Sequence, residues 1–390
     1  MFPLHISILL FLKVVLAFFL LYIFIPSRTI VFDEYGDAWY DKLFISLVHS
    51  NFVIIVFVHI LVAFRIYETI SLAIALIILM LYILSVILRQ PSMDEDSVQN
   101  KNILAFLLDL VDGRLGLFGN FLKSIKDFLK SLPMKIKNLI IYIFIHPFDG
   151  IFIIPLFAAA LYLRIKHSIE YLYYGASDCY VHLAWTKYLG INKIYQDGVY
   201  PYGYEAIISA LNKLFFIDPV VLIRFFGGIG SFLLLLSIYY ILKKNIKNQN
   251  IVIFAAVFAF AFGTEFPNSA STLWRQISAL PQEYATLFML PGIHFLNLFY
   301  NTGRKKYLVL SAEVLAITVF IHFYAAVFVA IGYVILSLFH IKKVFYGKTF
   351  FQLLGFMGGA GIIGILPIVT ALALGKKFHA LSYSYVAESA

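Results

Sequence analysis

The chain alternates between long apolar runs and short polar connections. Lipid offers the backbone no hydrogen bonds, and the runs lack the alternation of a β-barrel, so each run is predicted to form a helix. The pattern therefore predicts an all-α, polytopic integral membrane helical bundle with about ten transmembrane helices. The predicted spans, some of them short, are 4–26, 43–64, 67–88, 148–165, 219–242, 250–263, 283–300, 307–321, 323–339 and 350–374.

Three regions follow from the same pattern. Residues 1–90 hold three spans, the first of which we interpret as a retained helix because no small-residue cleavage site follows it. Residues 91–147 begin with the polar linker PSMDEDSVQNKN and continue as a basic amphipathic stretch, which is predicted to lie in the headgroup plane on the cytoplasmic side. This arrangement places Met1 outside, unless 103–122 re-enters the bilayer. Residues 148–390 hold the remaining spans.

Composition supports a membrane protein. Hydrophobic residues make up 62% of the chain and charged residues 13%, whereas soluble proteins average about 25% charged residues. The net charge of +9 does not indicate nucleic-acid binding, because Lys and Arg lie mainly in short connections between spans. Cys179 is the only cysteine, which excludes an internal disulfide and a thiolate metal cluster. The bias toward Ile, Lys, Phe and Tyr suits a prokaryote with AT-rich DNA.

Basic residues fall in alternate connections of the carboxy-terminal region, at 243–247, 304–306 and 342–348. The positive-inside rule places these three connections in the cytoplasm and the polar stretches 166–218 and 264–282 on the opposite side. We therefore expect the two outer stretches to meet on the non-cytoplasmic face of the membrane.

The first outer stretch contains the richest set of polar groups. If Ser177 caps a helix that starts at Asp178, then Asp178, His182 and Trp185 share one face of it. Such a carboxylate and imidazole could bind a divalent cation or a phosphate-bearing donor, or they could belong to an ordinary interfacial helix. Lys187, Asp197 and Glu205 add further charge to the stretch.

Turn signals follow in YQDGVYPYGYE, before an amphipathic helix at 204–218 that is predicted to lie on the membrane surface. The tyrosines of this segment suit an interface, and they equally suit stacking on a sugar or a prenyl chain.

The second outer stretch, GTEFPNSASTLWRQISALPQEYATLF, carries Glu265, Arg275 and Glu283. Ionisable residues near membrane depth are costly and are therefore functional candidates, although Glu283 could simply begin a helix. His322 interrupts a later apolar run, where it either faces the same cavity or marks a loop between two short helices. Gly355 and Gly359 are spaced as small residues that let helices approach closely.

Together these segments resemble the membrane glycosyltransferases of the GT-C superfamily, and in particular the catalytic subunits of oligosaccharyltransferases and their prokaryotic relatives. The resemblance rests on GASDCYVHLAWTKYLG, YPYGYEAI, RQISALPQEYATLFMLP and the span interrupted by His322. It covers about 148–374 and leaves the first three spans unmatched. It implies a GT-C-like fold, a polyprenyl-phosphate-linked sugar donor entering from the bilayer, and transfer at the outer face.

The resemblance also implies roles for residues. Asp178 matches the central carboxylate of the family and is the expected base, while Arg275 and His182 would steady the departing phosphate. A Mg or Mn ion would be held by Asp178, Glu265 and Glu283, although the paired DxD or ExD motif of the family is absent. No nucleotide or haem is expected. The residues expected to bind substrate are Lys187, Tyr200, Tyr202, Tyr204, Trp274 and His322.

Two other classes stay open. A non-catalytic GT-C-like subunit could anchor or assemble a larger complex with a partner protein, and the extra amino-terminal spans favour this alternative. A transporter is disfavoured because the spans show no matched pair of broken helices in two repeated halves.

Overall fold

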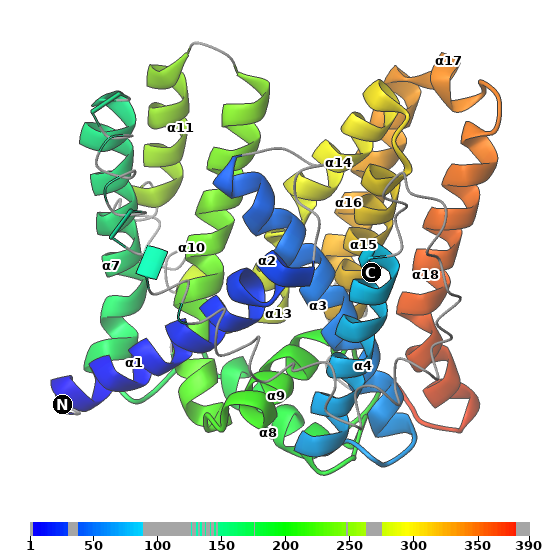
Figure 1. The fold of residues 1–390 in the computed structure, drawn as a ribbon. Helices are drawn as coiled ribbons and strands as arrows, with labels where there is room; N and C mark the ends of the chain where they lie inside the picture. The colour runs from blue at the N-terminus through cyan, green and yellow to red at the C-terminus, as the bar shows by residue number, and fades with distance from the viewer. Residues whose placement is uncertain are drawn as a thin grey trace, which may run out of the picture. The chain divides into compact units, whose positions relative to one another are not determined.

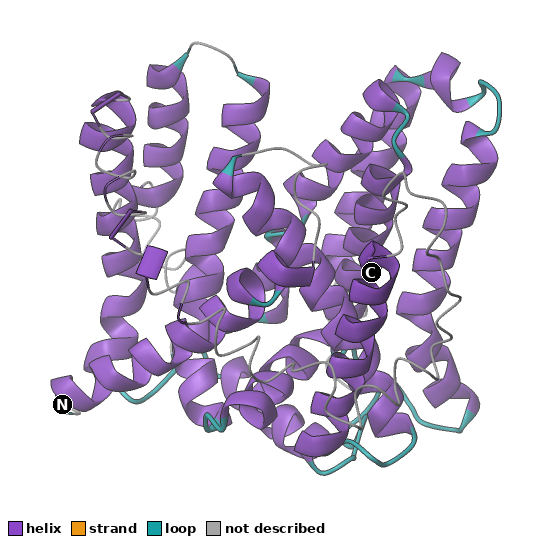
Figure 2. Ribbon diagram, viewed as in Figure 1, coloured by secondary structure: helices purple, strands orange, loops and turns teal. Residues whose placement is uncertain are grey.

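The structure is a computed structural model, and it describes residues 3–29, 38–88, 147–174, 176–246, 249–262 and 275–379, with isolated positions between 126 and 145. These ranges are predominantly helical, and Figure 2 shows helices joined by short loops. In place of a sheet, the described residues contain one isolated parallel bridge between Val199 and Phe378. The predicted all-α class is therefore confirmed for this part of the chain.

The helices of the described residues follow the apolar runs, with two short π-helical segments, η1 and η3, inside long helices (Figure 1). Their bounds are α1 (Leu4–Phe19), η1 (Leu20–Phe24), α2 (Pro26–Thr29), α3 (Trp39–Ala63), α4 (Thr69–Leu88), η3 (Asp149–Ile153), α7 (Ile154–Glu170), α8 (Asp178–Gly190), α9 (Gly203–Phe215), α10 (Pro219–Asn245), α11 (Asn250–Phe262), α13 (Pro281–Thr286), α14 (Met289–Thr302), α15 (Lys305–Ile321), α16 (Phe323–Phe339), α17 (Ile341–Val344) and α18 (Thr349–Ala373).

Five helices of the described residues are long and apolar enough to cross a membrane: Leu4–Phe24, Trp39–Ala63, Asp149–Glu170, Pro219–Asn245 and Thr349–Ala373. Asn250–Phe262 and Phe323–Phe339 are apolar but shorter, and the part Thr69–Leu79 of α4 is also apolar. The chain is thus a helical integral membrane protein, while the total of about ten spans stays a prediction. The predicted span 283–300 is interrupted, because α13 ends at Thr286 and α14 begins at Met289.

Contacts divide the chain into two units, one made of residues 1–75 with 159–390 and the other of residues 76–158. In the first unit α15 is the central helix, with α3, α14, α16 and α18 packed around it. Most of its residues from Tyr307 to Ile321 are buried. The amino-terminal helices and the later helices therefore share one core. Most of the predicted linker and amphipathic stretch, 91–147, lies outside the described residues.

Helix α18 packs closely against α15 at Gly364. A Cβ built on Gly364 would lie 2.8 Å from the Val319 side chain, whereas a Cβ on Gly355 or Gly359 would meet nothing within 4 Å. The prediction of close helix packing at Gly355 and Gly359 is therefore wrong. Sequence spacing locates small residues on a helix, but it does not say which of them faces a neighbour.

The basic connections lie at the end of the first unit opposite to α8 and α9 (Figure 1). At this basic end, Lys244 of α10 pairs with Asp41 of α3 at 2.6 Å, and Lys343 of α17 donates to Asn301 of α14 at 3.1 Å. At the α8–α9 end, the backbone of Tyr67 donates to Asn192. The structure thus separates the basic connections from the first outer stretch, as the charge pattern predicts.

Helix α9 is present where the sequence predicts it, but it does not lie on a surface. Every residue from Gly203 to Leu211 is buried, so the prediction of a surface helix is wrong. The cause is visible at Gly203, where a Cβ would lie 2.8 Å from the backbone of Phe320. A residue without a side chain lets the first turn of α9 lie directly against the end of α15.

Candidate functional site

The site is built around the start of α8, which begins at Asp178 as predicted. Ser177 makes no side-chain capping bond, however, and its backbone is already helical. Asp178 is exposed, whereas the next residue, Cys179, is buried with its Sγ 3.9 Å from the carbonyl oxygen of Ala279. This contact brings the first turn of α8, and with it Asp178, beside the segment that follows Arg275.

A buried histidine and carboxylate join α8 to α9. His182 Nδ1 lies 2.6 Å from Glu205 Oε1, and the side chain of Glu205 is fully buried. A carboxylate oxygen can only accept when ionised, so we assign the proton of this bond to Nδ1. The Nε2 atom of His182 is then the nitrogen that can exchange a proton or bind a ligand.

Aromatic rings surround this pair. The ring centroids of Trp185, Tyr204 and Tyr200 lie 5.3, 5.9 and 6.2 Å from that of His182. Trp185 Nε1 donates to Asp197 Oδ2 at 3.0 Å, which fixes the indole against the loop between α8 and α9. Burial and the nearby carboxylates of Glu205 and Asp178 raise the pKa of Tyr200. The site is therefore enclosed by aromatic side chains and carries negative charge.

His322 faces this cluster from the other side. It is the single residue between α15 and α16, its backbone is extended, and its ring centroid lies 6.3 Å from that of Tyr200. Burial lowers the pKa of His322 to about 4, and the nearby Arg275 guanidinium and the His182 imidazole, when protonated, act in the same direction. Both predicted alternatives hold at once, because His322 separates two helices and also faces the site.

Arg275 is held by two side chains of α13. Its Nε donates to Glu283 Oε1 at 2.6 Å and its NH2 group donates to Gln282 Oε1 at 2.7 Å. Arg275 remains exposed, with 55% of its side-chain surface accessible. The guanidinium is thus oriented but still able to meet a ligand.

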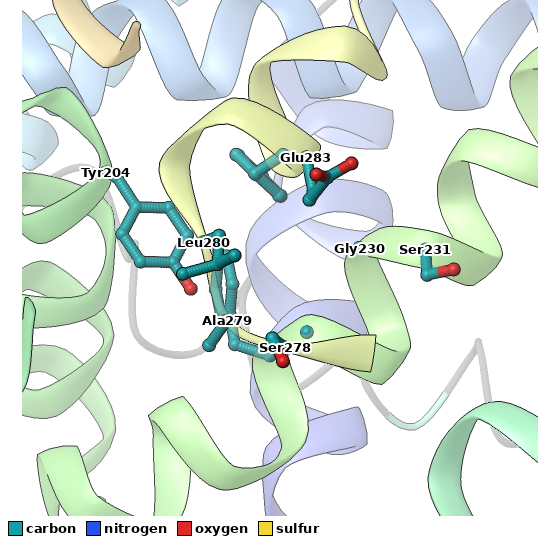
Figure 3. Close-up of a pocket in the computed structure, with 10 residues that line it drawn as sticks. Tyr204, Gly230, Ser231, Ser278, Ala279, Leu280 and Glu283 are labelled. Carbon is teal, nitrogen blue, oxygen red and sulfur yellow. The ribbon is translucent and has the colours of Figure 1, made fainter. Parts of the chain in front are cut away.

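A small cavity of about 10 Å³ lies beside this ion pair and is about large enough for one water molecule. In Figure 3 the Tyr204 ring lies next to Leu280 and Ala279, with Glu283 and Ser231 along the same cavity. The buried hydroxyl of Tyr204 has no hydrogen-bond partner among the described residues. A water molecule in the cavity is one candidate partner for that hydroxyl.

The other predicted substrate-binding residues lie in different environments. Tyr202 is buried and stacks on Trp185 with centroids 5.4 Å apart, an arrangement that suits packing more than ligand contact. Lys187 is exposed on the side of α8 away from buried His182 and Trp185. Trp274 and Glu265 lie outside the described residues.

The predicted metal site is only partly described. Asp178 is exposed, and Glu283 is engaged by Arg275. In the described part of the chain, no group of three His, Cys, Asp or Glu side chains is arranged to hold a metal ion. The Mg or Mn site stays a prediction, because its third expected ligand, Glu265, lies outside the described residues.

Several residues complete the site without a role predicted from the sequence. The sequence identifies Glu205 only as a charge of the first outer stretch, although a carboxylate beside the apolar run AIISAL indicates a buried partner. His379 lies against Trp185, with centroids 5.2 Å apart, and the Lys376 ammonium donates to the carbonyls of Ile194 and Tyr195. No local pattern indicates that the residues after α18 return to the loop between α8 and α9.

Comparison with protein-family models, with curated proteins and with solved protein structures gives no match for this chain.

Proposed function

We propose that this chain is a GT-C-like membrane glycosyltransferase that transfers a sugar from a polyprenyl-phosphate-linked donor at the non-cytoplasmic face. The observation that carries the proposal is the meeting of the two outer stretches. Cys179 contacts Ala279, and His322 experiences the charges of both His182 and Arg275. A carboxylate, an imidazole and a guanidinium therefore lie around one region at the end of the bundle opposite the basic connections.

The residues suit the charges that develop during glycosyl transfer. The Asp178 carboxylate takes the proton of the acceptor hydroxyl as the acceptor oxygen bonds to the anomeric carbon of the sugar. The bond from that carbon to the donor phosphate breaks, and its electron pair leaves with the phosphate. Arg275 stabilises the departing anion, and His182 assists through Nε2 while Glu205 holds Nδ1.

Apolar surface beside the site supports a lipid-linked donor. Helix α16 begins directly after His322 with exposed side chains, and Tyr324, Val327 and Phe328 are each more than half exposed. In a membrane these side chains meet lipid, so a prenyl chain lying along α16 would bring its phosphate toward His322. No step of this mechanism requires a divalent ion.

The test is a transfer assay with the purified chain in proteoliposomes. The donors are undecaprenyl-phosphate hexoses labelled in the sugar, and the measured quantity is label lost from the lipid fraction. We expect Asp178→Asn to lower the rate by about 100-fold or more, because a general base contributes on that order. The matched control is Glu68→Gln, which removes an exposed carboxylate that pairs with Lys213 outside the site.

Unchanged transfer in the Asp178 variant, with the thermal stability of the wild type, would remove Asp178 from this role. No transfer by the wild-type chain from any hexose donor would count against the enzyme as a whole.

One observation favours the alternative of a non-catalytic membrane subunit. Arg275 is already bonded to Glu283 and Gln282, an arrangement that a structural role explains without any ligand. This alternative predicts a stoichiometric partner protein that copurifies with the chain, and no lipid-linked sugar. The glycosyltransferase proposal predicts that polyprenyl phosphates copurify, which mass spectrometry of the extracted lipids would detect.

A further inference from the structure

A second cavity lies at the basic end of the bundle, away from the site described above. Its volume is about 440 Å³, and it is formed by the end of α14, by α17 and by the start of α18. The polar groups that line it come from Tyr300, Lys342, Lys343, Tyr346, Thr349 and Gln352. The proposed glycosyl transfer uses none of these residues.

The segments that line this cavity carry positive charge and contribute no carboxylate. No Asp or Glu occurs in residues 284–312 or 314–387, the segments that supply the whole lining. Lys343 donates to Asn301 at 3.1 Å, a neutral partner that orients the ammonium without neutralising it. Lys342 and Lys343 are both exposed, and Lys348 adds a third cation directly before α18. The cavity is therefore suited to an anion.

The surroundings of the cavity indicate that this anion belongs to a lipid. Phe345, Tyr346 and Phe351 are 68%, 80% and 71% exposed, and the ring of Phe345 stacks on that of Phe350. Exposed aromatic residues beside lysines at the end of a spanning helix are typical of the headgroup layer. Below this level, α16 and α18 continue with exposed apolar side chains such as Leu338 and Leu354. These side chains provide a surface for acyl chains.

We propose that this cavity binds the phosphate-bearing headgroup of an anionic phospholipid. Lys342 and Lys343 supply the cationic partners of the phosphate, while Thr349 and Gln352 supply neutral donors. The acyl chains lie on the apolar faces of α16 and α18. A soluble phosphate could use the same cations, but it would gain nothing from the exposed aromatic and apolar surface beside them.

The experiment measures binding of fluorescent phosphatidylglycerol to the full chain purified in detergent. The test variant is Lys342→Gln with Lys343→Gln, and the matched control is Lys305→Gln with Lys306→Gln, which removes the same charge from the first turn of α15, outside the cavity lining. Each lysine near an anionic lipid surface contributes on the order of 1 kcal/mol, so we expect the test variant to bind roughly tenfold to thirtyfold more weakly. The control variant retains binding close to that of the wild type.

Three outcomes would overturn the proposal. The first is unchanged binding by the test variant, and the second is an equal loss in the control variant, which would indicate general charge attraction. The third is equally strong displacement of the lipid by inorganic phosphate, which would assign the cavity to a soluble anion. Competition by unlabelled phosphatidylglycerol, but not by phosphatidylcholine, would support a headgroup site.

Discussion

Among single residues, the geometry of the site depends most on the pairing of His182 with Glu205. Both side chains are buried, and each is the polar partner of the other across two helices. Such a pair adds little stability relative to an apolar pair of the same shape, but removing one member leaves a buried polar group unpaired. The pair therefore fixes how α8 and α9 face each other, and the geometry of the site depends on it.

We expect Glu205→Ala to destabilise the protein by about 3 kcal/mol, since the imidazole then loses its buried partner. Glu205→Gln should cost less, because the amide oxygen still accepts from Nδ1. Thermal unfolding in detergent measures both effects. Glu68→Ala, which breaks an exposed ion pair, is the control and should change stability by less than about 1 kcal/mol. Equal losses in the Glu205 and Glu68 variants would contradict the buried pairing.

His322 predicts a pH dependence whose sign follows from its lowered pKa. In the folded chain its pKa is about 4, below the ordinary value of 6.5. As the pH falls, His322 is therefore protonated at a higher pH in the unfolded chain than in the folded chain. Stability is then fully present above pH 6.5 and is lost as the pH falls toward 4. We expect His322→Asn to flatten the fall in unfolding temperature between pH 7 and pH 5. An unchanged slope in this variant would contradict the role of His322 in the pH dependence.

Single residues also show which features of the site can be predicted from the sequence. It predicts Asp178 as the first residue of a helix, and it predicts that His182, Arg275 and His322 lie on the same side of the bundle. It could not pair Arg275 with Glu283 or His182 with Glu205, because pairing depends on side-chain directions that are fixed only after the helices pack. It also could not show that Tyr202 would be covered by Trp185.

Among the elements, α9 and α18 show the difference between forming a helix and placing it. The amphipathic pattern of 204–218 is sufficient for a helix, but the same pattern fits a membrane surface and a protein core. Packing against α15 decides in favour of the core. Helix α18 has a glycine-rich run, and most of these glycines have no atom of another helix within 4 Å of a built Cβ. Among the described glycines of α18, Gly364 alone lies against α15.

The contact between α15 and α18 can be tested by adding one methyl group. Gly364→Ala places a Cβ 2.8 Å from Val319, so we expect a loss of about 1–3 kcal/mol from overpacking. Gly358→Ala, in the same helix, meets nothing within 4 Å and should leave stability unchanged or slightly raised. The unfolding temperatures of the two variants, measured in detergent, compare these two effects on stability. A loss of the same size in both would contradict the role of the contact, because helix propensity favours Ala over Gly at either position.

For the whole molecule, the distribution of charge predicts which connections lie at each end of the first unit. The connections that carry Lys244 and Lys343 lie at one end of the first unit, and α8 and α9 lie at the other (Figure 1), with His322 beside Tyr200 of the loop that joins them. The sequence predicts this separation from the connections alone, since the positive-inside pattern does not depend on how the helices pack. The hydropathy pattern does not predict the interrupted segment between α13 and α14, because the run 283–300 is apolar on both sides of the break.

Accessibility of introduced cysteines tests this arrangement. In a background with Cys179→Ser, we expect Gln196→Cys to react with a membrane-impermeant maleimide on intact cells. Thr302→Cys, near the basic connections, should react only after the membrane is opened. Both positions are exposed, so burial does not confuse the result. Labelling of both from outside would contradict the opposite placement of the two ends, and the reverse pattern would invert the orientation.

The bridge between Val199 and Phe378 sets an order of events during biosynthesis. Val199 donates its amide to the carbonyl of Lys377 and accepts from the amide of His379, and Lys376 reaches back 182 positions to Ile194. The ribosome therefore releases the loop between α8 and α9 long before it makes the partners of that loop. A nascent chain arrested before α18 holds the His182 and Glu205 side chains but lacks the segment that closes over Trp185. The cluster reaches its final form only when α18 has inserted and residues 376–379 have folded back onto the loop between α8 and α9.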